Sequence, residues 1–400
     1  MSDTRSHASP SRRGSKVTSA LLVAHPRISV LPLDGREVAV GRAELGTADE
    51  EVSSRHATLT RAGDGHALVD LRSRNGTFVN GARLEAERPM PLVDGDIVRM
   101  GSTLAVFREG DRADPAPPPD GHGGPFGQGD LELQLRAISR RRRVSFVLVQ
   151  GETGSGKESA ARQVGARLRP RGPLLVTNLA QLAPGSFQSQ LFGHARGAFT
   201  SAVAPHRGLL VDAGEGALVL DELTEIPLEH QAALLRALEN SEITPVGGAP
   251  RRHAALVIGT TNRDLPAAVA SGALRADLAA RLSMAAITVA PLRARAEDIP
   301  SIAGALVARD GLALDAEVEA MEHLMRLPLL DNARGLARVL STAVGDGGRL
   351  RQRDVERVAG APPPLDLSRV HAGAYASDRQ LARAAGVSRR QAMKKKRATP

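Results

Sequence analysis

The sequence predicts a multidomain fold in which an all-β sandwich precedes an α/β domain with a helical lid and a C-terminal helix-turn-helix. Three observations predict it. Short apolar segments separated by Asp-Gly and Asn-Gly turns fill residues 18–108. An apolar strand runs into a glycine-rich loop and a helix at 144–168. Residues 378–397 show two helical patterns joined by a Gly-containing turn.

Proline and glycine indicate the boundaries between these parts. Residues 109–129 have the composition of a linker, and an Ala-Pro-Pro-Pro run occupies 361–364. The polar, basic residues 1–17 predict a disordered leader. We therefore expect a β-sandwich at 18–108, an α/β core at 130–300, a helical lid at 301–358, and a linker with a helix-turn-helix at 359–400.

Composition limits the function classes. With 42% apolar residues in 400, the chain can bury substantial cores. It has no cysteine, which excludes disulfides and thiolate metal sites and fits a reducing cytoplasm. No apolar run reaches the length of a membrane span, so we expect a cytoplasmic protein without a membrane partner. The net charge of +9 favours a polyanionic partner, whereas 2% aromatic residues argue against base-stacking platforms.

The turns of the first domain carry a set of polar motifs in a fixed order. These are Gly41-Arg42, Ser54-Arg55-His56, Ser73-Arg74-Asn75-Gly76 and Asn80-Gly81. The set resembles the forkhead-associated (FHA) domain, which binds phosphothreonine in peptides. Guanidinium groups supply the planar, charge-assisted donors that a phosphate dianion requires.

The resemblance implies that Arg42 and Ser54 contact the phosphate, with Arg55 and Arg74 nearby, while Asn75 holds the peptide backbone. His56 would brace the loops from inside. The partner would then be a phosphothreonine protein of a Ser/Thr kinase pathway. Two alternatives remain: these groups are solvated loop residues and hairpin turns, or the fold has lost phosphopeptide binding.

The second domain is organised around a phosphate loop. The strand 144–150 leads into a loop and helix start that contain Gly151, Glu152, Thr153, Gly154, Ser155, Gly156, Lys157 and Glu158. Glycines let successive N–H groups face one anion, and the lysine reaches the outer phosphates. Ser or Thr usually follows the lysine, but this chain has Glu158.

Further strands of this domain end in polar residues. The apolar strand 216–220 ends in Asp221 and Glu222, which suit Mg²⁺ held through water and the orientation of an attacking water. The strand 255–261 ends in Asn262. Alternating strands and helices predict a doubly wound parallel sheet with its ligand at the carboxyl ends of the strands.

Several stretches between 130 and 345 resemble the bacterial enhancer-binding proteins, the AAA+ activators of sigma-54 RNA polymerase. Residues 191–202 are similar to their LFGHxxGAFTGA signature, 151–158 to GExGxGKE, and 291–300 to PLRxRxEDIP. The second of these patterns accounts for Glu158. The resemblance implies an ATPase that uses ATP and Mg²⁺, with residues 151–158 and Asn262 at the nucleotide.

The same resemblance implies further roles. Asn178 would hold Glu222 back until the switch, and Arg275 and Arg281 would reach the ATP of a neighbouring subunit in a homo-oligomeric ring, a hexamer by family pattern. The alternative for these arginines is a charge pair on a helix surface. Arg334 would contact nucleotide from sensor II, although the aromatic, Pro, Gly and Glu of that motif are replaced.

The segment that would contact sigma-54 departs from the family at one position. Gly197, Ala198, Phe199, Thr200 and Ala202 match it, but Ser201 replaces a glycine. If this position requires φ > 0, the added side chain costs about 1 kcal/mol or more. We expect the loop to engage sigma-54 with altered efficiency.

The C-terminal segment resembles a Fis-type helix-turn-helix for double-stranded DNA. Ser388 would cap a recognition helix that presents Arg389, Arg390 and Gln391 to the major groove, with Lys394 and Lys395 on phosphates. A basic tail is the alternative, because Gln391 and Ala392 replace the usual anchors.

Together these features predict a sigma-54-dependent transcriptional activator whose ATP hydrolysis remodels the closed polymerase complex under the control of a phosphothreonine protein. The alternative is a phosphopeptide-binding adaptor or DNA-binding regulator whose AAA+ domain binds nucleotide without acting on sigma-54.

Overall fold

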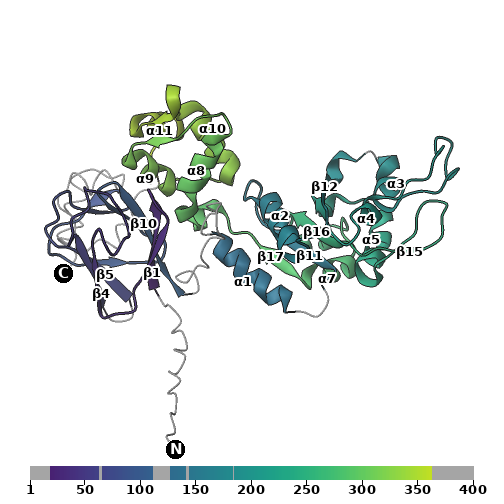
Figure 1. Cartoon of the computed structure of the whole chain (residues 1–400), viewed down its shortest axis with the longest axis horizontal. Coiled ribbons are helices and arrows are strands. Elements are labelled where there is room, and N and C mark those ends of the chain that lie inside the picture. Colours follow the sequence, from purple (N-terminus) through teal and green to yellow (C-terminus); the bar gives the residue numbers. More distant parts are fainter. Residues whose placement is uncertain (1–18, 63–64, 111–126, 141–143, 183, 363–400) are drawn as a thin grey trace, which may run out of the picture. The chain divides into compact units, whose positions relative to one another are not determined.

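A computed structural model of the chain describes residues 19–62, 65–110, 127–140, 144–182 and 184–362 (Figure 1). The predicted leader, most of the predicted linker, and the C-terminal residues Ser388, Arg389, Arg390, Gln391, Lys394 and Lys395 lie outside the described residues. Within the described residues, no helix is both long and apolar enough to span a bilayer. Two units separate near residue 115, and each is described by itself.

The N-terminal unit is a β-sandwich. One sheet has the strand order β2-β1-β10-β9-β6-β7 and the other has the order β3-β4-β5-β8. Their bounds are β1 Ser19–His25, β2 Ser29–Pro32, β3 Glu37–Val40, β4 Ala57–Ala62, β5 Gly65–Asp70, β6 Thr77–Val79, β7 Ala82–Arg83, β8 Met90–Leu92, β9 Ile97–Met100 and β10 Thr103–Glu109. The inward side chains of both sheets form one core, which includes Leu21, Leu59 and Phe107.

The sequence located five of these strands and missed the shorter ones. The apolar segments at 20–24, 38–40, 67–71, 97–100 and 104–107 coincide with β1, β3, β5, β9 and β10. The strands β2, β6, β7 and β8 have two to four residues and give no periodic signal. β4 also lacks an apolar run, because Thr58 and Thr60 alternate with apolar residues. The all-β prediction for this unit is confirmed.

The second unit begins with α1 (Gly127–Ser139), inside the end of the predicted linker, and contains a five-stranded parallel sheet. The strand order is β12-β13-β16-β11-β17, and the helix α2 (Lys157–Leu168) follows β11 directly. The strand bounds are β11 Phe146–Gln150, β12 Leu174–Asn178, β13 Ala217–Asp221, β16 Leu256–Thr261 and β17 Ala286–Thr288. The prediction of a doubly wound parallel sheet is confirmed.

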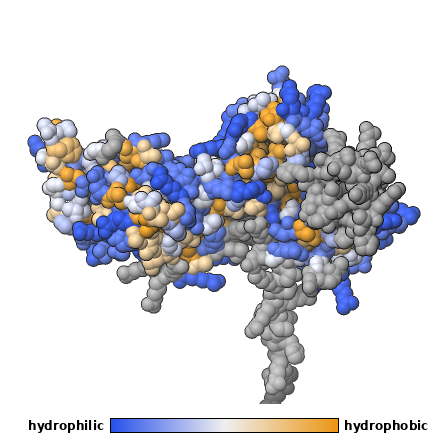
Figure 2. Space-filling view, turned by 180° about the vertical axis from the view of Figure 1, so that it is seen from behind, coloured by the Kyte–Doolittle hydropathy of each residue, from blue (hydrophilic) through white to orange (hydrophobic). Residues whose placement is uncertain are grey.

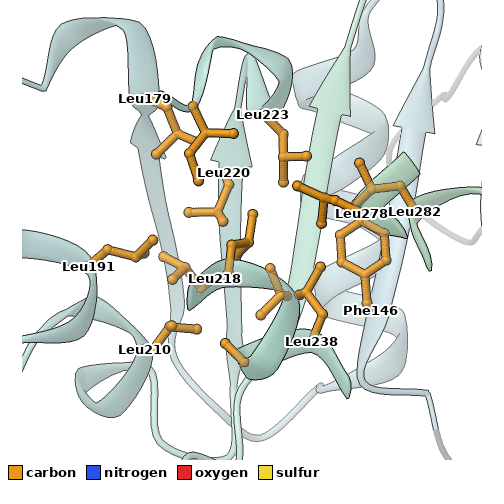
Figure 3. Packing of buried hydrophobic residues seen from close by; sticks show 14 of the residues in the cluster. Phe146, Leu179, Leu191, Leu210, Leu218, Leu220, Leu223, Leu238, Leu278 and Leu282 are labelled. Atoms are coloured by element: carbon orange, nitrogen blue, oxygen red, sulfur yellow. The ribbon is translucent and has the colours of Figure 1, made fainter. Parts of the chain in front are cut away.

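Apolar side chains cover both faces of this sheet. On one face, Leu218 and Leu220 of β13 pack in one cluster with Leu238 of α5 (Leu228–Asn240), with α7 (Ala276–Ser283) and with the segment around α3 (Phe187–Phe192) (Figure 3). On the other face, Val147 and Val149 pack with α1 and α2. Burial on both faces explains why the strands appear in the sequence as continuous apolar runs.

Shorter helices complete the unit. On the sheet side these are α4 (Leu209–Asp212) and α6 (Leu265–Ala270), and a small hairpin is formed by β14 (Glu242–Ile243) and β15 (Arg251–Arg252). A helical lid follows the sheet, with α8 Ile299–Ala308, α9 Val318–Arg326, α10 Asn332–Ala343 and α11 Gln352–Ala359. The short strands β18 (Asp315–Ala316) and β19 (Arg349–Leu350) pair in parallel within it.

Candidate nucleotide site and binding loops

The phosphate loop lies at the carboxyl end of β11, where it joins α2. Gly154 and Gly156 have φ of 74° and 96°, a backbone region that glycine adopts without strain. At Gly154 a side chain is also excluded by space, because a Cβ would lie 2.4 Å from the Asp331 carbonyl oxygen. The loop therefore has the curled backbone that the glycine pattern predicts.

Two buried polar groups face the region in front of this loop. Lys157 is only 8% exposed and donates to the Glu152 carbonyl oxygen at 3.0 Å. Burial lowers the pKa of Lys157, while the nearby Glu222 and Asp221 oppose that shift. The Ser155 hydroxyl is buried and has no hydrogen-bond partner among the described residues. An ammonium and a hydroxyl with unused donors fit a phosphate ligand.

A cavity of about 390 Å³ adjoins the loop within this unit. Ser155 and Gly156 line it on the loop side, Val289 and Ala290 follow β17, and Arg334 and Ala337 contribute from α10. Its walls are mostly apolar with a few polar groups, as in a site for a purine base and sugar. Sequence reasoning named Ser155, Gly156 and Arg334 among the lining residues but missed Val289 and Ala290.

The tip of β13 lies opposite the loop and is held by side-chain hydrogen bonds. Asp221 accepts from Thr260 Oγ1 at 2.5 Å and from Asn178 Nδ2 at 3.1 Å. Thr260 Oγ1 in turn accepts the backbone N–H of Glu222, at 3.2 Å. We expected Asn178 to hold Glu222, but its amide instead contacts Asp221. Sequence reasoning missed Thr260, which only the pairing of neighbouring strands brings to this carboxylate.

Glu222 has a left-handed backbone, with φ of 54°. Its carboxylate is half-buried and close enough to Lys157 to act on the lysine pKa. A non-glycine residue in this region is uncommon and often marks a functional position. Both carboxylates therefore lie within electrostatic reach of the Lys157 ammonium, as the sequence predicts.

Other predicted nucleotide-binding residues are placed differently. Asn262 Nδ2 donates to Thr153 Oγ1 at 3.0 Å, so β16 reaches the loop. Glu158 lies on the exposed side of α2 and pairs with Arg162 at 2.9 Å, away from the groups that face Lys157. Arg334 lies across the cavity from the loop, and its charge contributes to the lowered pKa of Lys157.

The two candidate arginine fingers differ in their surroundings. Arg275 is about half exposed and pairs with Asp277 at 2.8 Å. Arg281 is half-buried, and its guanidinium donates to the Leu238 carbonyl oxygen at 2.8 Å and to Ser145 Oγ at 3.1 Å. Arg275 can therefore reach a neighbouring molecule after giving up one surface ion pair, whereas Arg281 is used within its own subunit.

The predicted sigma-54 loop extends between α3 and α4, at the same end of the domain as the β14–β15 loop (Figure 1). Its base is closed by a backbone bridge between His194 and His206. The second loop braces it, because Ala195 N donates to the Val246 carbonyl oxygen at 2.9 Å. Sequence reasoning missed this brace, since residues 244–250 give no motif by themselves.

The loop tip is apolar and exposed. Phe199 and Val203 are 42% and 80% exposed, and in Figure 2 this end carries pale and orange atoms among blue ones at the left. Gly197 N donates to the Ala202 carbonyl oxygen at 2.8 Å, which closes the turn around Thr200. Ser201 does not have a positive φ, so the strain that we considered for this position is absent from this conformation.

The predicted phosphopeptide residues lie on connected loops at one end of the sandwich. His56 is fully buried; its Nδ1 accepts the Ser53 N–H at 3.0 Å and its Nε2 lies 3.3 Å from the Gly76 carbonyl oxygen. Asn75 Nδ2 donates to the Glu51 carbonyl oxygen at 2.8 Å, and Arg74 N donates to Ser53 Oγ at 3.3 Å. These contacts join the loop 51–55 to the loop 72–76.

The binding groups themselves point outward. Arg42 contacts the Val52 carbonyl oxygen with Nε and Nη2, both at 3.3 Å, and these long bonds leave most of its donor capacity free. The exposed side chains of this set are Arg42, Ser54, Arg55, Arg74 and Asn75. The structure thus brings all five predicted residues to neighbouring exposed loops.

Comparison with known families agrees with this geometry. Residues 131–288 match the Sigma-54 interaction domain family, and residues 35–101 match the FHA domain family. The nitric oxide reductase transcription regulator NorR1 of Cupriavidus necator is 38% identical over 285 residues, which are 67% of this chain and 54% of that protein. The regulatory protein AtoC of Escherichia coli is 38% identical over 205 residues, 50% of this chain and 44% of AtoC.

The similarity to one solved structure covers a slightly larger share of this chain than the similarity to these two regulators. The crystal structure of NtrX from Brucella abortus in complex with ADP has a TM-score of 0.51 and 26% identity, and the similarity covers 69% of this chain and 61% of NtrX. The chain spans about half the length of the curated relatives it matches. It therefore combines an FHA domain with a sigma-54 interaction domain.

Proposed function

We propose that this protein is an ATP-hydrolysing activator of sigma-54 RNA polymerase that responds to a phosphothreonine protein. The observation that carries the proposal is the buried Lys157, within electrostatic reach of Asp221 and Glu222 and directly after the loop residues that line the cavity. The matched Sigma-54 interaction domain family supports the link to polymerase. The ADP complex of NtrX supports a nucleotide as the ligand.

In this proposal, the loop amides, Ser155 and Lys157 hold the phosphates of ATP. Mg²⁺, held near Asp221 through water, would neutralise charge on the β- and γ-phosphates. Glu222 accepts a proton from a water that attacks the γ-phosphorus. The bond to the bridging oxygen then breaks, and ADP and inorganic phosphate are released.

Arg275 of a neighbouring subunit would stabilise the charge that develops on the transferred phosphoryl group. This role is supported by the half-exposed position of Arg275, whose ion pair with Asp277 lies on the surface. The role requires a homo-oligomeric ring. Movement of the exposed loop 197–202 with nucleotide state would transmit the work to sigma-54. The input would come from a phosphothreonine held by Arg42 and Ser54.

The substitution Lys157→Ala tests the enzymatic part. We expect loss of ATP hydrolysis and of ATP-dependent open-complex formation at a sigma-54 promoter, because no other ammonium among the described residues faces the loop. Arg162→Ala is the matched control, since Arg162 lies on the exposed side of the same helix and should leave both activities unchanged. A Lys157→Ala protein that hydrolyses ATP as fast as the parent would contradict the proposal.

The same transcription assay separates this function from the alternative of a phosphopeptide adaptor. An adaptor would bind ADP and phosphopeptide but give no ATP-dependent transcription from a sigma-54 promoter. For the input, binding of a phosphothreonine peptide should fall strongly in Arg42→Ala. It should be unchanged in Arg61→Ala, an exposed residue near the other end of β4. The parent and both variants should fail to bind the unphosphorylated peptide.

A further inference from the structure

The phosphate loop is joined to the lid by a cluster of side chains to which the mechanism above gives no role. The Glu152 carboxylate receives Arg293 Nη1 at 2.7 Å and Nη2 at 2.5 Å. Asn332 Nδ2 donates to the same carboxylate at 3.1 Å and to the Thr153 carbonyl oxygen at 3.0 Å. We name Glu152, Arg293 and Asn332 the loop–lid cluster.

Asn332 is completely buried at the first position of α10. Its Oδ1 accepts the backbone N–H of Leu292 at 2.6 Å, so both ends of its amide are used. Its φ is 54°, a left-handed conformation that Asn tolerates better than most residues. The next residue extends the connection, because Ala333 N donates to the Gly154 carbonyl oxygen at 3.1 Å.

These contacts fix the position of Arg334. It follows Ala333 in the first turn of α10 and lines the cavity together with Ser155 and Gly156. Helix α10 cannot rotate or slide without breaking the bonds of Asn332 and Ala333 to the loop. The geometry of the loop–lid cluster is therefore transmitted directly to Arg334, a lid arginine near Lys157.

Stability alone does not account for the ionic part of the cluster. The side chains of Glu152 and Arg293 are 42% and 41% exposed, and exposed ion pairs contribute little to folding. Hydrogen bonds from the Arg293 guanidinium and the Asn332 amide lower the pKa of Glu152 to about 2, so its carboxyl group stays ionised. A carboxylate beside a phosphate loop would repel phosphates unless other groups neutralised and turned it aside, as Arg293 and Asn332 do here.

We propose that the loop–lid cluster sets nucleotide affinity by positioning Arg334, so that Glu152 is a positioning residue rather than a phosphate ligand. The inference rests on the nucleotide site proposed above. It also implies that lid and loop move as one body when nucleotide binds. The remnant of sensor II would then act through two residues of this chain, Asn332 for position and Arg334 for contact.

The test is a titration of the full chain with fluorescently labelled ADP and Mg²⁺. We expect Glu152→Ala and Arg293→Ala each to weaken ADP binding about threefold to thirtyfold, and the double variant no more than the stronger single one, because coupled residues are not additive. Asn332→Gly should weaken binding similarly, since glycine keeps the left-handed backbone and removes only the side chain. Arg338→Ala should bind like the parent, because it breaks only the exposed Arg338–Asp331 pair on the same helix.

The decisive measurement compares ADP affinity with and without Glu152→Ala in a protein that already carries Arg334→Ala. If the cluster acts through Arg334, adding Glu152→Ala to Arg334→Ala should cause little further loss of affinity. Full additivity in that background would overturn the proposal, as would unchanged ADP affinity in all three cluster variants. Failure of the parent protein itself to bind ADP would instead defeat the proposed nucleotide site, so the two failures are distinguishable.

Discussion

His56 shows how one buried side chain organises a binding surface that it does not itself form. Its two ring nitrogens connect Ser53 on one loop to Gly76 on the next. Because the Ser53 N–H donates to Nδ1, the ring must be neutral with its hydrogen on Nε2. Burial lowers the pKa of His56 below 6.5, in agreement with this assignment.

The stability of the sandwich should therefore depend on pH through His56. In the unfolded chain the ring binds a proton more readily, so its contribution is complete above pH 6.5 and is lost as the pH falls toward the lowered folded pKa. His56→Gln keeps a donor and an acceptor but does not titrate. Thermal unfolding at pH 7.5 and 5.5 should show a smaller loss on acidification for His56→Gln than for the parent, and equal losses would refute this role.

At the scale of elements, the acidic strand tip depends on close packing between β16 and the turn after β13. A Cβ on Gly259 would lie 2.7 Å from Leu223 Cδ1 and 3.3 Å from Leu223 Cβ. Leu223 is fully buried and directly follows Glu222. The absence of a side chain at position 259 thus lets the turn that carries Glu222 pack closely on the sheet.

Gly259→Ala should destabilise the domain by about 1–3 kcal/mol, because the core must shift to accept one methyl group. It should also weaken ATP hydrolysis, since the displaced Leu223 moves Glu222. Gly304→Ala in α8 is the opposite control: a Cβ there meets no atom within 4 Å, and alanine should stabilise the helix by about 0.5–1 kcal/mol. Urea unfolding of both variants checks the pair, and a neutral Gly259→Ala would contradict the packing argument.

At the scale of the whole molecule, the proposed function requires a second subunit that contributes Arg275 to the ATPase site. Of the two candidate arginines, Arg275 is the exposed one. Arg281 is bound to Ser145 and Leu238 within its own subunit. Loss of Arg281 should therefore lower the stability of each subunit. Loss of Arg275 should lower the rate of hydrolysis and leave each subunit folded.

Mixing two inactive variants tests this division. Lys157→Ala supplies an intact Arg275, and Arg275→Ala supplies an intact nucleotide site, so mixed rings should recover part of the ATPase activity that each lacks alone. Arg281→Ala alone should melt at a lower temperature but hydrolyse ATP without a complementing partner while it is folded, because it keeps Lys157 and Arg275. If no mixture recovers activity while ring assembly is intact, Arg275 does not act between subunits.

Local motifs allowed much of this protein to be predicted. The glycine pattern at 151–156 requires a curled backbone wherever it occurs, and Asp221 must follow the buried strand whose end it marks. The FHA loop residues were likewise located, because turns and charged side chains are determined by short stretches. What the sequence by itself determined is therefore the set of loops and strand ends that carry the chemistry.

Only the tertiary structure decided which residues those ends meet. Thr260 reaches Asp221, Val246 braces the exposed loop, and Asn332 reaches Glu152 from far along the chain. It also gave Ser201 an unstrained backbone. These outcomes depend on strand order and on helix packing, which sum many weak contacts between distant segments and leave no signal in any one stretch of sequence.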